Sequence, residues 1–465
     1  MYSAKGQHFE LMWYGKEEAI KAASSPTMSR LIDAPEDASS HAGSHLIIEG
    51  DNLEALKLLQ RQDAHNIDLI YLDPPYNTGK DFVYHDRFSA PLKAYLEATG
   101  QQQDKARESS GRHHTSWLNM MYPRLMVACQ LLSDRGVIFI SIDDHEVHHL
   151  LMLLNEIMGE ENHLATLVVS LNPKGRQLGR FATAHEYVLV YAKDAQRCEL
   201  EYAIAELVNP KDFPRSDAQG SYRFLPLRNS NKRFNPTTRP NLYYPLYINS
   251  ESGEVSVDAH SGWREVYPVF GSGEPAVWRW SRAKVARESD QLTGDLIKGR
   301  LGPRWDVRQR DYNYAGRKKK LKSIWLSNEV GSTDEAAREL IALGLEVFET
   351  PKPVALIQRI ISLMPKDSVI LDFFAGSGTT GEATLRQNLK DQGSRRYILI
   401  QRATPIDHSE FSTIAQLTRE RMRRVASHLS AEHHPETGSK VQDVSEVLDL
   451  GFSASRVVSD EDTIM

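Results

Sequence analysis

The chain has 465 residues, 40% apolar and 25% charged, a length that predicts more than one structural unit. Its 56 basic and 62 acidic residues give a net charge of −6, which excludes a chain that binds polyanions over its whole surface. Two cysteines are too few for a disulfide framework, and no apolar run is long enough to span a membrane, so we expect a cytoplasmic protein without membrane contact.

Short apolar runs alternate with helical patterns along the chain, which predicts an α/β fold with a doubly wound, mostly parallel sheet. The predicted strands, in chain order, are Leu46–Glu49, Ile67–Leu72, Gly136–Ile142, Glu186–Tyr191, Ser368–Phe373 and Arg396–Gln401. The block at roughly 200–330 is rich in Pro, Asn, Arg and aromatic residues and lacks long periodic runs. We therefore expect one sheet that is interrupted by an inserted module.

Two polar segments are not expected to pack. The segment Glu97–Ser116 has too few apolar residues for a core and is predicted to be a mobile loop. The residues after Ser430 carry many acids and few bases, which is typical of a solvated or frayed terminus.

A rigid turn follows the predicted strand Ile67–Leu72. It consists of Asp73, Pro74, Pro75 and Tyr76. Two successive prolines fix the backbone and remove two amide donors, which leaves carbonyl groups free to accept hydrogen bonds. A carboxylate and an aromatic ring are thereby held at the end of a strand, where open α/β sheets bind their ligands.

One segment of the chain matches a zinc-binding pattern. The segment His145–His149 satisfies H-E-x-x-H, the pattern of zinc proteases. No third ligand of the extended protease pattern follows it, so we expect no metal.

The segment Leu371–Gly381 predicts a strand, a glycine-rich turn and the start of a helix. Such turns point helix N–H groups at a ligand, although a tight turn without ligand is the alternative. A phosphate-binding NTPase loop is excluded, because Glu382 stands where that loop needs Lys. The glycines fit a dinucleotide spacing, but Gln401 replaces the acid expected at the end of the next strand, which weakens that interpretation.

Together, the two turns resemble the methyltransferases that use S-adenosylmethionine to methylate exocyclic amines of DNA bases, and Asp73–Tyr76 is similar to the motif of the adenine-N6 enzymes. The Asp73–Tyr76 motif precedes Phe374–Gly378 along the chain. This order of motifs resembles the permuted β class, in which a target-recognition domain is inserted between the two motifs. The resemblance extends to Ile48–Leu53, Gly136–Asp144, His185–Lys193 and Thr350–Pro353. The segments Asn77–Gly79, Lys320–Trp325 and Phe348–Pro353 look most like the modification subunits of type III restriction systems.

The resemblance implies direct methyl transfer to the N6 amine of adenine in duplex DNA. Asp73 and a prolyl carbonyl, that of Pro74, would accept hydrogen bonds from the amine, while Tyr76 would stack on a base rotated out of the helix. Methylation of cytosine carbon 5 is not expected, because it needs a thiolate, usually after Pro, whereas Cys129 and Cys198 follow Ala and Arg.

For the donor, S-adenosylmethionine, the resemblance implies a site built from several loops. The implied contacts are Asp51, Lys352, Asp372, Phe374, Ala375, Gly376, Ser377, Gly378, Thr379 and Gln401. Asp51 would contact the adenine ring of the donor, and Gln401 would bind its ribose hydroxyls without the help of a charge.

Positive charge gathers in the expected insert, where residues 296–322 hold ten Lys or Arg against two Asp. This distribution favours contacts to DNA phosphates. The candidates are Arg223, Arg228, Lys232, Arg233, Arg317, Lys318, Lys319 and Lys320.

The predicted organisation has five parts. They are an N-terminal extension (1–44), a catalytic half (45–200), a target-recognition insert (201–330), a cofactor-binding half (331–430) and an acidic C-terminal tail (431–465). Two further functions stay open, a recognition subunit for a restriction helicase-nuclease and an RNA adenine methyltransferase. A homodimer is also compatible with the sequence.

Overall fold

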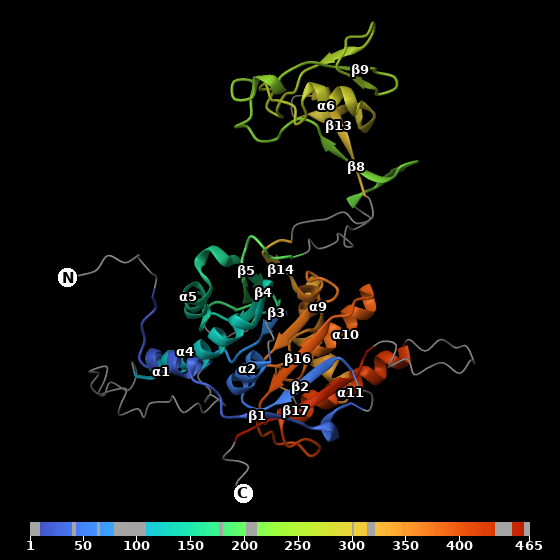
Figure 1. Ribbon diagram of the computed structural model, residues 1–465. Helices are drawn as coiled ribbons and strands as arrows, with labels where there is room; N and C mark the ends of the chain where they lie inside the picture. Colours follow the sequence, from blue (N-terminus) through green and yellow to red (C-terminus); the bar gives the residue numbers. More distant parts are fainter. Residues whose placement is uncertain are drawn as a thin grey trace, which may run out of the picture. The chain divides into compact units, whose positions relative to one another are not determined.

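The computed structural model describes residues 10–39, 43–62, 66–78, 108–175, 180–200, 212–299, 302–313, 321–346, 348, 350–432 and 449–459 (Figure 1). The chain divides into two compact units, one formed by residues 1–202 and 321–465 and the other by residues 203–320. The second unit therefore interrupts the first in sequence, and it ends at Lys320, before the limit at residue 330 that the composition suggested.

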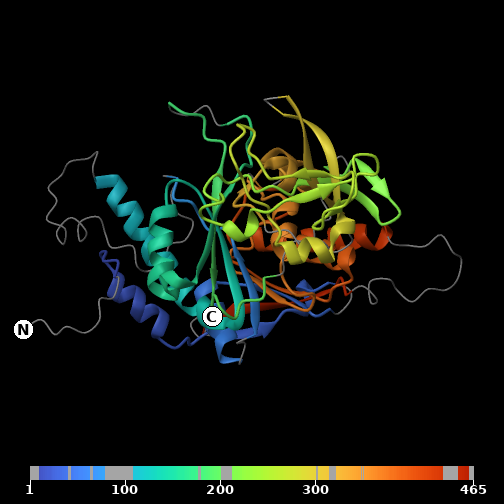
Figure 2. The same ribbon diagram turned by 90° about the horizontal axis from the view of Figure 1, so that it is seen from above.

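A ten-stranded sheet in the order β1-β17-β2-β16-β15-β3-β4-β6-β5-β14 forms the centre of the first unit (Figures 1 and 2). Its strands are β1 (Arg30–Asp33), β2 (His45–Glu49), β3 (Ile67–Leu72), β4 (Leu132–Ile142), β5 (His163–Val169), β6 (Glu186–Ala192), β14 (Ile324–Trp325), β15 (Val369–Asp372), β16 (Arg396–Gln401) and β17 (Phe452–Val458). The strands from β17 to β4 are parallel, while β6 is antiparallel to both neighbours. The predicted α/β fold is confirmed.

Helices cover both faces of this sheet (Figure 2). One core joins the sheet to α1 (Lys16–Ser24), α2 (Asn52–Arg61), α4 (Glu108–Leu131) and α5 (Val147–Met158). Another joins it to α8 (Thr333–Ala342), α10 (Thr379–Asp391) and α11 (Ile414–Glu432). Successive side chains of β2, Ile47 and Ile48, enter different cores, as expected for opposite faces of a strand.

The first unit also contains α7 (Ser327–Val330), α9 (Val354–Ile361) and the 3-10 helices Pro35–Asp37 and Glu160–Asn162. None of the helices in the described ranges has the length and apolar content that a membrane span needs.

The second unit contains two small antiparallel sheets. One has the order β12-β13-β8-β7, and the other has the order β10-β9-β11. The strands are β7 (Arg215–Asp217), β8 (Gly220–Pro226), β9 (Leu246–Ile248), β10 (Val255–Ser256), β11 (Arg264–Val266), β12 (Leu292–Gly299) and β13 (Gly302–Tyr312). The helices are α6 (Arg282–Arg287) and the 3-10 turns Pro240–Leu242 and Ser289–Gln291. The buried Trp278 and Trp280 belong to its core.

Two predictions about polar segments were wrong in part. Helix α4 begins at Glu108, so the end of the segment that was expected to be a loop is helical. The helix includes these polar residues because they continue directly into its buried part, which starts at Trp117. The acidic tail contains β17, whose Phe452 is buried and which pairs with β2 and β1. Residues 97–107 and 433–448 lie outside the described ranges.

Candidate active site

The two predicted turns meet at one edge of the sheet. Strands β3 and β15 are parallel neighbours, so the turns that follow them leave the sheet at the same edge. A cavity of about 60 Å³ lies between the turns. Its lining includes Asp73, Thr350, Pro351, Lys352, Asp372, Phe374, Ala375, Gly376, Ser377 and Thr379. The structure thus brings one predicted catalytic residue, Asp73, together with predicted donor-binding residues.

Contacts from α4 and from the start of α5 fix the catalytic turn. The indole N–H of the buried Trp117 donates to the Pro75 carbonyl at 2.7 Å. Asn77 adopts a left-handed φ of 61°, and its side-chain amide donates to Glu146. Because prolines also fix their own φ angles, the Asp73 carboxylate projects from a rigid turn.

The carboxylate of Glu146 is fully buried and has two histidine partners. Nδ1 of His114 lies 2.6 Å from one oxygen, and Nδ1 of His149 lies 2.7 Å from the other. The hydrogen bond that His149 donates to the Glu146 carboxylate raises the pKa of His149. Within the described residues, these three side chains form the group whose spacing could hold a metal.

The zinc-protease pattern does not describe this histidine pair. His145, the first histidine of the pattern, has its Nδ1 2.9 Å from Asp143 instead. The expected absence of a metal stays a prediction.

Lys352 and Glu186 lie beside the catalytic carboxylate. The Lys352 ammonium is 3.0 Å from Oδ1 of Asp73 and 3.5 Å from Oε2 of Glu186. The Tyr76 hydroxyl donates to the same Glu186 oxygen at 3.4 Å. Burial raises the pKa of Glu186 to about 7. Burial alone would lower the pKa of Lys352, but the two carboxylates raise it, so the ammonium stays charged.

Glu186 and Trp117 were not among the predicted site residues, and Glu146 was considered only as part of the H-E-x-x-H pattern. Glu186 stands in the segment His185–Lys193, where an acid at the start of an apolar strand was the available signal. Lys352 was expected at the donor, and in the structure its ammonium contacts two carboxylates and lies 4.8 Å from the centre of the Tyr76 ring. Its contact with the donor stays a prediction.

The glycine-rich turn forms a cradle that side chains would fill. Gly376 and Gly378 have φ values of 53° and 89°, which L side chains rarely adopt. A Cβ on Gly376 would lie 3.2 Å from the ring of Phe348. Because Gly376 has no side chain of its own over the backbone of the turn, a ligand in the cavity can approach that backbone closely. This agrees with the donor site that the resemblance implies.

Asp372 holds the start of this turn from within the core. Its carboxylate accepts the Phe374 N–H at 3.0 Å and the Thr380 hydroxyl at 2.5 Å. Burial raises the pKa of Asp372 to about 7. The carboxyl thus links the end of β15 to the first turn of α10.

Asp51 and Gln401 lie at the ends of β2 and β16, next to the same turn. Asp51 caps α2 by accepting the Leu53 N–H at 2.9 Å. Gln401 is buried, and its Oε1 accepts the Gly376 N–H at 2.8 Å. The structure gives both side chains a local role, and their predicted contacts with the donor stay predictions.

Comparison with known proteins agrees with this geometry. Residues 67–403 match the N6 and N4 DNA methylase family. The chain belongs to this family. It is 35% identical to the Mod subunit of the type III restriction-modification enzyme EcoPI from Escherichia phage P1, over 90% of this chain and 68% of that protein. It is also 35% identical to the type II methyltransferase M.KpnI from Klebsiella pneumoniae, over 82% of this chain and 88% of that protein.

The predicted resemblance to DNA amino-methyltransferases and to Mod subunits is confirmed. The protein is a DNA methyltransferase, and S-adenosylmethionine is its methyl donor. Among solved structures, it is similar to the cytosine-N4-specific PvuII DNA methyltransferase, with a TM-score of 0.37 and 11% identity over 83% of this chain and 95% of that one. Similarity to the M1.HpyAVI–SAM complex has a TM-score of 0.34 and 15% identity, over 81% of this chain and 99% of that one.

The predicted DNA-binding residues that the structure describes lie in the second unit, and they differ from one another in their contacts. Arg223 pairs with Asp311 at 2.8 Å, and Lys232 pairs with Glu274 at 3.3 Å. The Arg228 guanidinium lies 5.9 Å from the centre of the Phe270 ring. Arg233 is exposed, and Arg317, Lys318, Lys319 and Lys320 lie outside the described residues.

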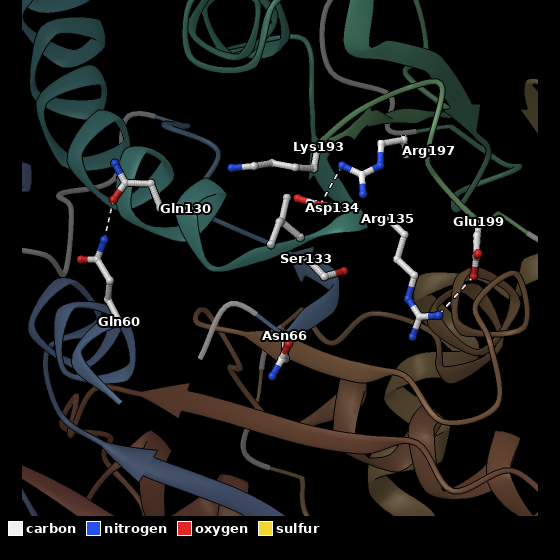
Figure 3. A pocket seen from close by; sticks show the side chains of 10 residues that line it. Gln60, Asn66, Gln130, Ser133, Asp134, Arg135, Lys193, Arg197 and Glu199 are labelled. Carbon is white, nitrogen blue, oxygen red and sulfur yellow. Dashed lines mark hydrogen bonds and ion pairs between the residues drawn. The ribbon is translucent and has the colours of Figure 1, made fainter. Parts of the chain in front are cut away.

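A larger pocket, about 830 Å³, lies at the opposite edge of the sheet, around the starts of β3 and β4 (Figure 3). Its cations already have partners. Arg197 pairs with Asp134 at 2.7 Å, Arg135 pairs with Glu199 at 3.2 Å, and Lys193 donates to a backbone carbonyl. The predicted chemistry is therefore concentrated in the smaller cavity at the other edge.

The stability of the methyltransferase should depend on the ionisation of Asp372. The pKa of this carboxyl is about 7 in the folded protein and 3.8 in its unperturbed state. Between these values the folded state holds a proton that the unfolded state has released. The free energy of unfolding contributed by Asp372 should therefore fall as the pH rises, by up to about 1.4 kcal/mol per pH unit.

Urea denaturation of the wild type and of Asp372→Asn between pH 4.5 and 7.5 tests this expectation. Other carboxyl groups titrate in both proteins, so the difference between the two curves isolates Asp372. The variant should gain stability relative to the wild type as the pH rises. Parallel curves would show that Asp372 is ionised in the folded protein throughout this range.

Proposed function

We propose that the methyltransferase modifies the N6 amine of adenine at specific sites in duplex DNA. The observation that carries the proposal is that the Asp73 carboxylate and the glycine-rich turn line one cavity. S-adenosylmethionine would supply an electrophilic methyl group there, and Phe374–Gly378 and Thr350–Pro353 would hold it.

The residues of the catalytic turn act by positioning and by electrostatics. The Asp73 carboxylate and the Pro74 carbonyl would accept hydrogen bonds from the two N–H groups of the adenine amine, which frees its lone pair for direct attack on the methyl group. The Tyr76 ring would stack on the base after rotation out of the duplex.

The cysteines support amine methylation over methylation of cytosine carbon 5. The Cys129 thiol is buried, and burial raises its pKa to about 12, so it is not a thiolate at neutral pH. The Cys198 thiol donates to the Ala195 carbonyl at 3.6 Å. Neither environment favours a nucleophile.

The basic residues of the second unit would bind DNA phosphates. Arg233 is the most direct candidate, because it is exposed, whereas Arg223 and Lys232 have acidic partners. Such contacts fix the register of the protein on the duplex.

Transfer of labelled methyl groups to duplex DNA, followed by nucleoside analysis, tests the function. We expect the label in N6-methyladenine. Label in N4-methylcytosine would overturn the target base, and label in 5-methylcytosine would overturn the mechanism. Structured RNA as a competing substrate distinguishes a DNA enzyme from an RNA enzyme.

A second role is favoured by the similarity to a protein named as a Mod subunit. In this role the chain would also be the DNA-recognition partner of a restriction helicase-nuclease. Full activity of the isolated chain in the same assay would favour a solitary enzyme, such as one related to the type II methyltransferase M.KpnI.

A further inference from the structure

The Lys352 ammonium lies where the mechanism needs the adenine amine. It is 3.0 Å from Oδ1 of Asp73, the carboxylate proposed to accept hydrogen bonds from the amine. It is also 4.8 Å from the centre of the Tyr76 ring, on which the target base would stack. An ammonium and an aromatic amine both donate N–H groups, so Lys352 and the base compete for the same two partners.

Glu186 is the other carboxylate within reach of this ammonium. Its Oε2 lies 3.5 Å from Nζ of Lys352, and its Oε1 is buried without a hydrogen-bond partner among the described residues. Only 13% of the Glu186 side chain and 11% of the Lys352 side chain are exposed. An ammonium at such a site needs a carboxylate, because water solvates it poorly.

We propose that Lys352 is a placeholder for the target amine, and that Glu186 receives its ammonium when the base enters the site. This inference rests on the proposed function. Glu186 is then a positioning residue, which acts by drawing Lys352 away from Asp73. The net charge of the site is unchanged by this shift, since one ammonium moves between two carboxylates.

The surroundings of Lys352 confine the shift to its side chain. Pro351 and Pro353 flank it, and Pro353 precedes the first residue of α9, so the backbone is fixed. The ammonium already lies between its two partners, and a rotation of the flexible lysine stem suffices to change the shorter contact. Asp73 then presents its oxygens to the amine.

A neutral residue at position 186 should trap the ammonium on Asp73. We expect Glu186→Gln in the whole 465-residue chain to lower kcat/KM for duplex DNA on the order of ten- to a hundredfold, the range that one charge-assisted hydrogen bond supports. Affinity for S-adenosylmethionine, measured by calorimetry, should stay close to that of the wild type. An unchanged kcat/KM would overturn the inference.

A second substitution separates this role from direct catalysis. In the double variant Glu186→Gln with Lys352→Met, no ammonium competes for Asp73. Because Lys352 is also a predicted donor contact, both variants are assayed with S-adenosylmethionine at a concentration that saturates each of them, and kcat/KM for duplex DNA should then be higher for the double variant than for Glu186→Gln alone. A double variant that is no more active than the single one would show that Glu186 does not act through Lys352, and would overturn the proposal.

The pH profile gives an independent readout. The titratable groups that face Glu186 are Lys352, Asp73 and Tyr76. Since Glu186 must be ionised to receive the ammonium, kcat/KM of the wild type should fall as the pH drops through about 7, the pKa of this carboxyl. Glu186→Gln should lack this step, and an identical step in both proteins would contradict the proposal.

Different results would contradict the proposed adenine methylation and the proposed role of Lys352 and Glu186. A wild-type protein that methylates no DNA adenine would overturn the proposed function. An active wild type whose Glu186→Gln variant is equally active would overturn only the role of Lys352 and Glu186.

Discussion

Replacing Asp73 by alanine should lower the rate of methyl transfer by about 10²- to 10³-fold or more, because it removes the carboxylate that would accept a hydrogen bond from the target amine. Affinity for S-adenosylmethionine should change little, since the glycine-rich turn keeps its contacts with Asp372 and Gln401. Asp73 is 27% exposed in its side chain, so its loss should leave the fold intact. Single-turnover transfer of labelled methyl groups, together with calorimetry of donor binding, measures both effects.

Asp144→Ala is a matched control. Asp144 follows β4, the strand beside β3, and its carboxylate accepts the Tyr187 hydroxyl at 2.9 Å. Its loss should change the rate by no more than about threefold, as is usual for a surface substitution. Near-normal turnover by Asp73→Ala would remove the proposed mechanism, and an equal loss in both variants would indicate a general effect of charge at this edge.

The central strands and both turns could be predicted from the sequence because their signals are local. Strand β3 is buried along its whole length, and every residue from Ile67 to Leu72 except Asp68 is apolar. The prolines after it and the glycines after β15 restrict or free the backbone by themselves, whatever lies around them. The family resemblance rested on these segments.

The outer strands β1 and β17 could not be predicted, because their pairing depends on distant residues. Strand β17 is a short segment that follows a long acidic stretch, and it is stabilised by pairing with β2 and β1 from the other end of the chain. Its sequence alone resembles an ordinary polar terminus. The burial of Phe452 becomes evident only when the sheet is assembled.

The contacts within the site could not be predicted for the same reason, because they join residues that are distant in the sequence. Glu186 begins β6, Lys352 precedes α9 and Asp73 follows β3, so three distant segments form one charge cluster. A motif search finds each segment but not the contact between them. The support of the catalytic turn by Trp117 is equally invisible, since it is a single hydrogen bond from a buried helix.

The largest effect on stability is expected for Arg421, which supports the glycine-rich turn from α11. Its fully buried guanidinium pairs with Glu382 at 2.8 Å and donates to the hydroxyls of Ser377 and Thr379, both at 2.8 Å. Arg421→Met would leave the Glu382 carboxylate, 2% exposed, without this partner. Loss of one member of a buried pair lowers the free energy of unfolding by about 3–5 kcal/mol.

Urea denaturation measures this loss, and Arg386→Met is the matched control. Arg386 contacts the same Glu382 carboxylate at 2.8 Å, but 36% of its side chain is exposed, so its loss should lower the free energy of unfolding by about 1 kcal/mol or less. Adding Glu382→Leu to Arg421→Met should restore part of the stability, because the buried charge is then gone. Equal losses in the two arginine variants would mean that burial does not strengthen the pair, and Arg421 would then have no special part in holding the donor-binding turn.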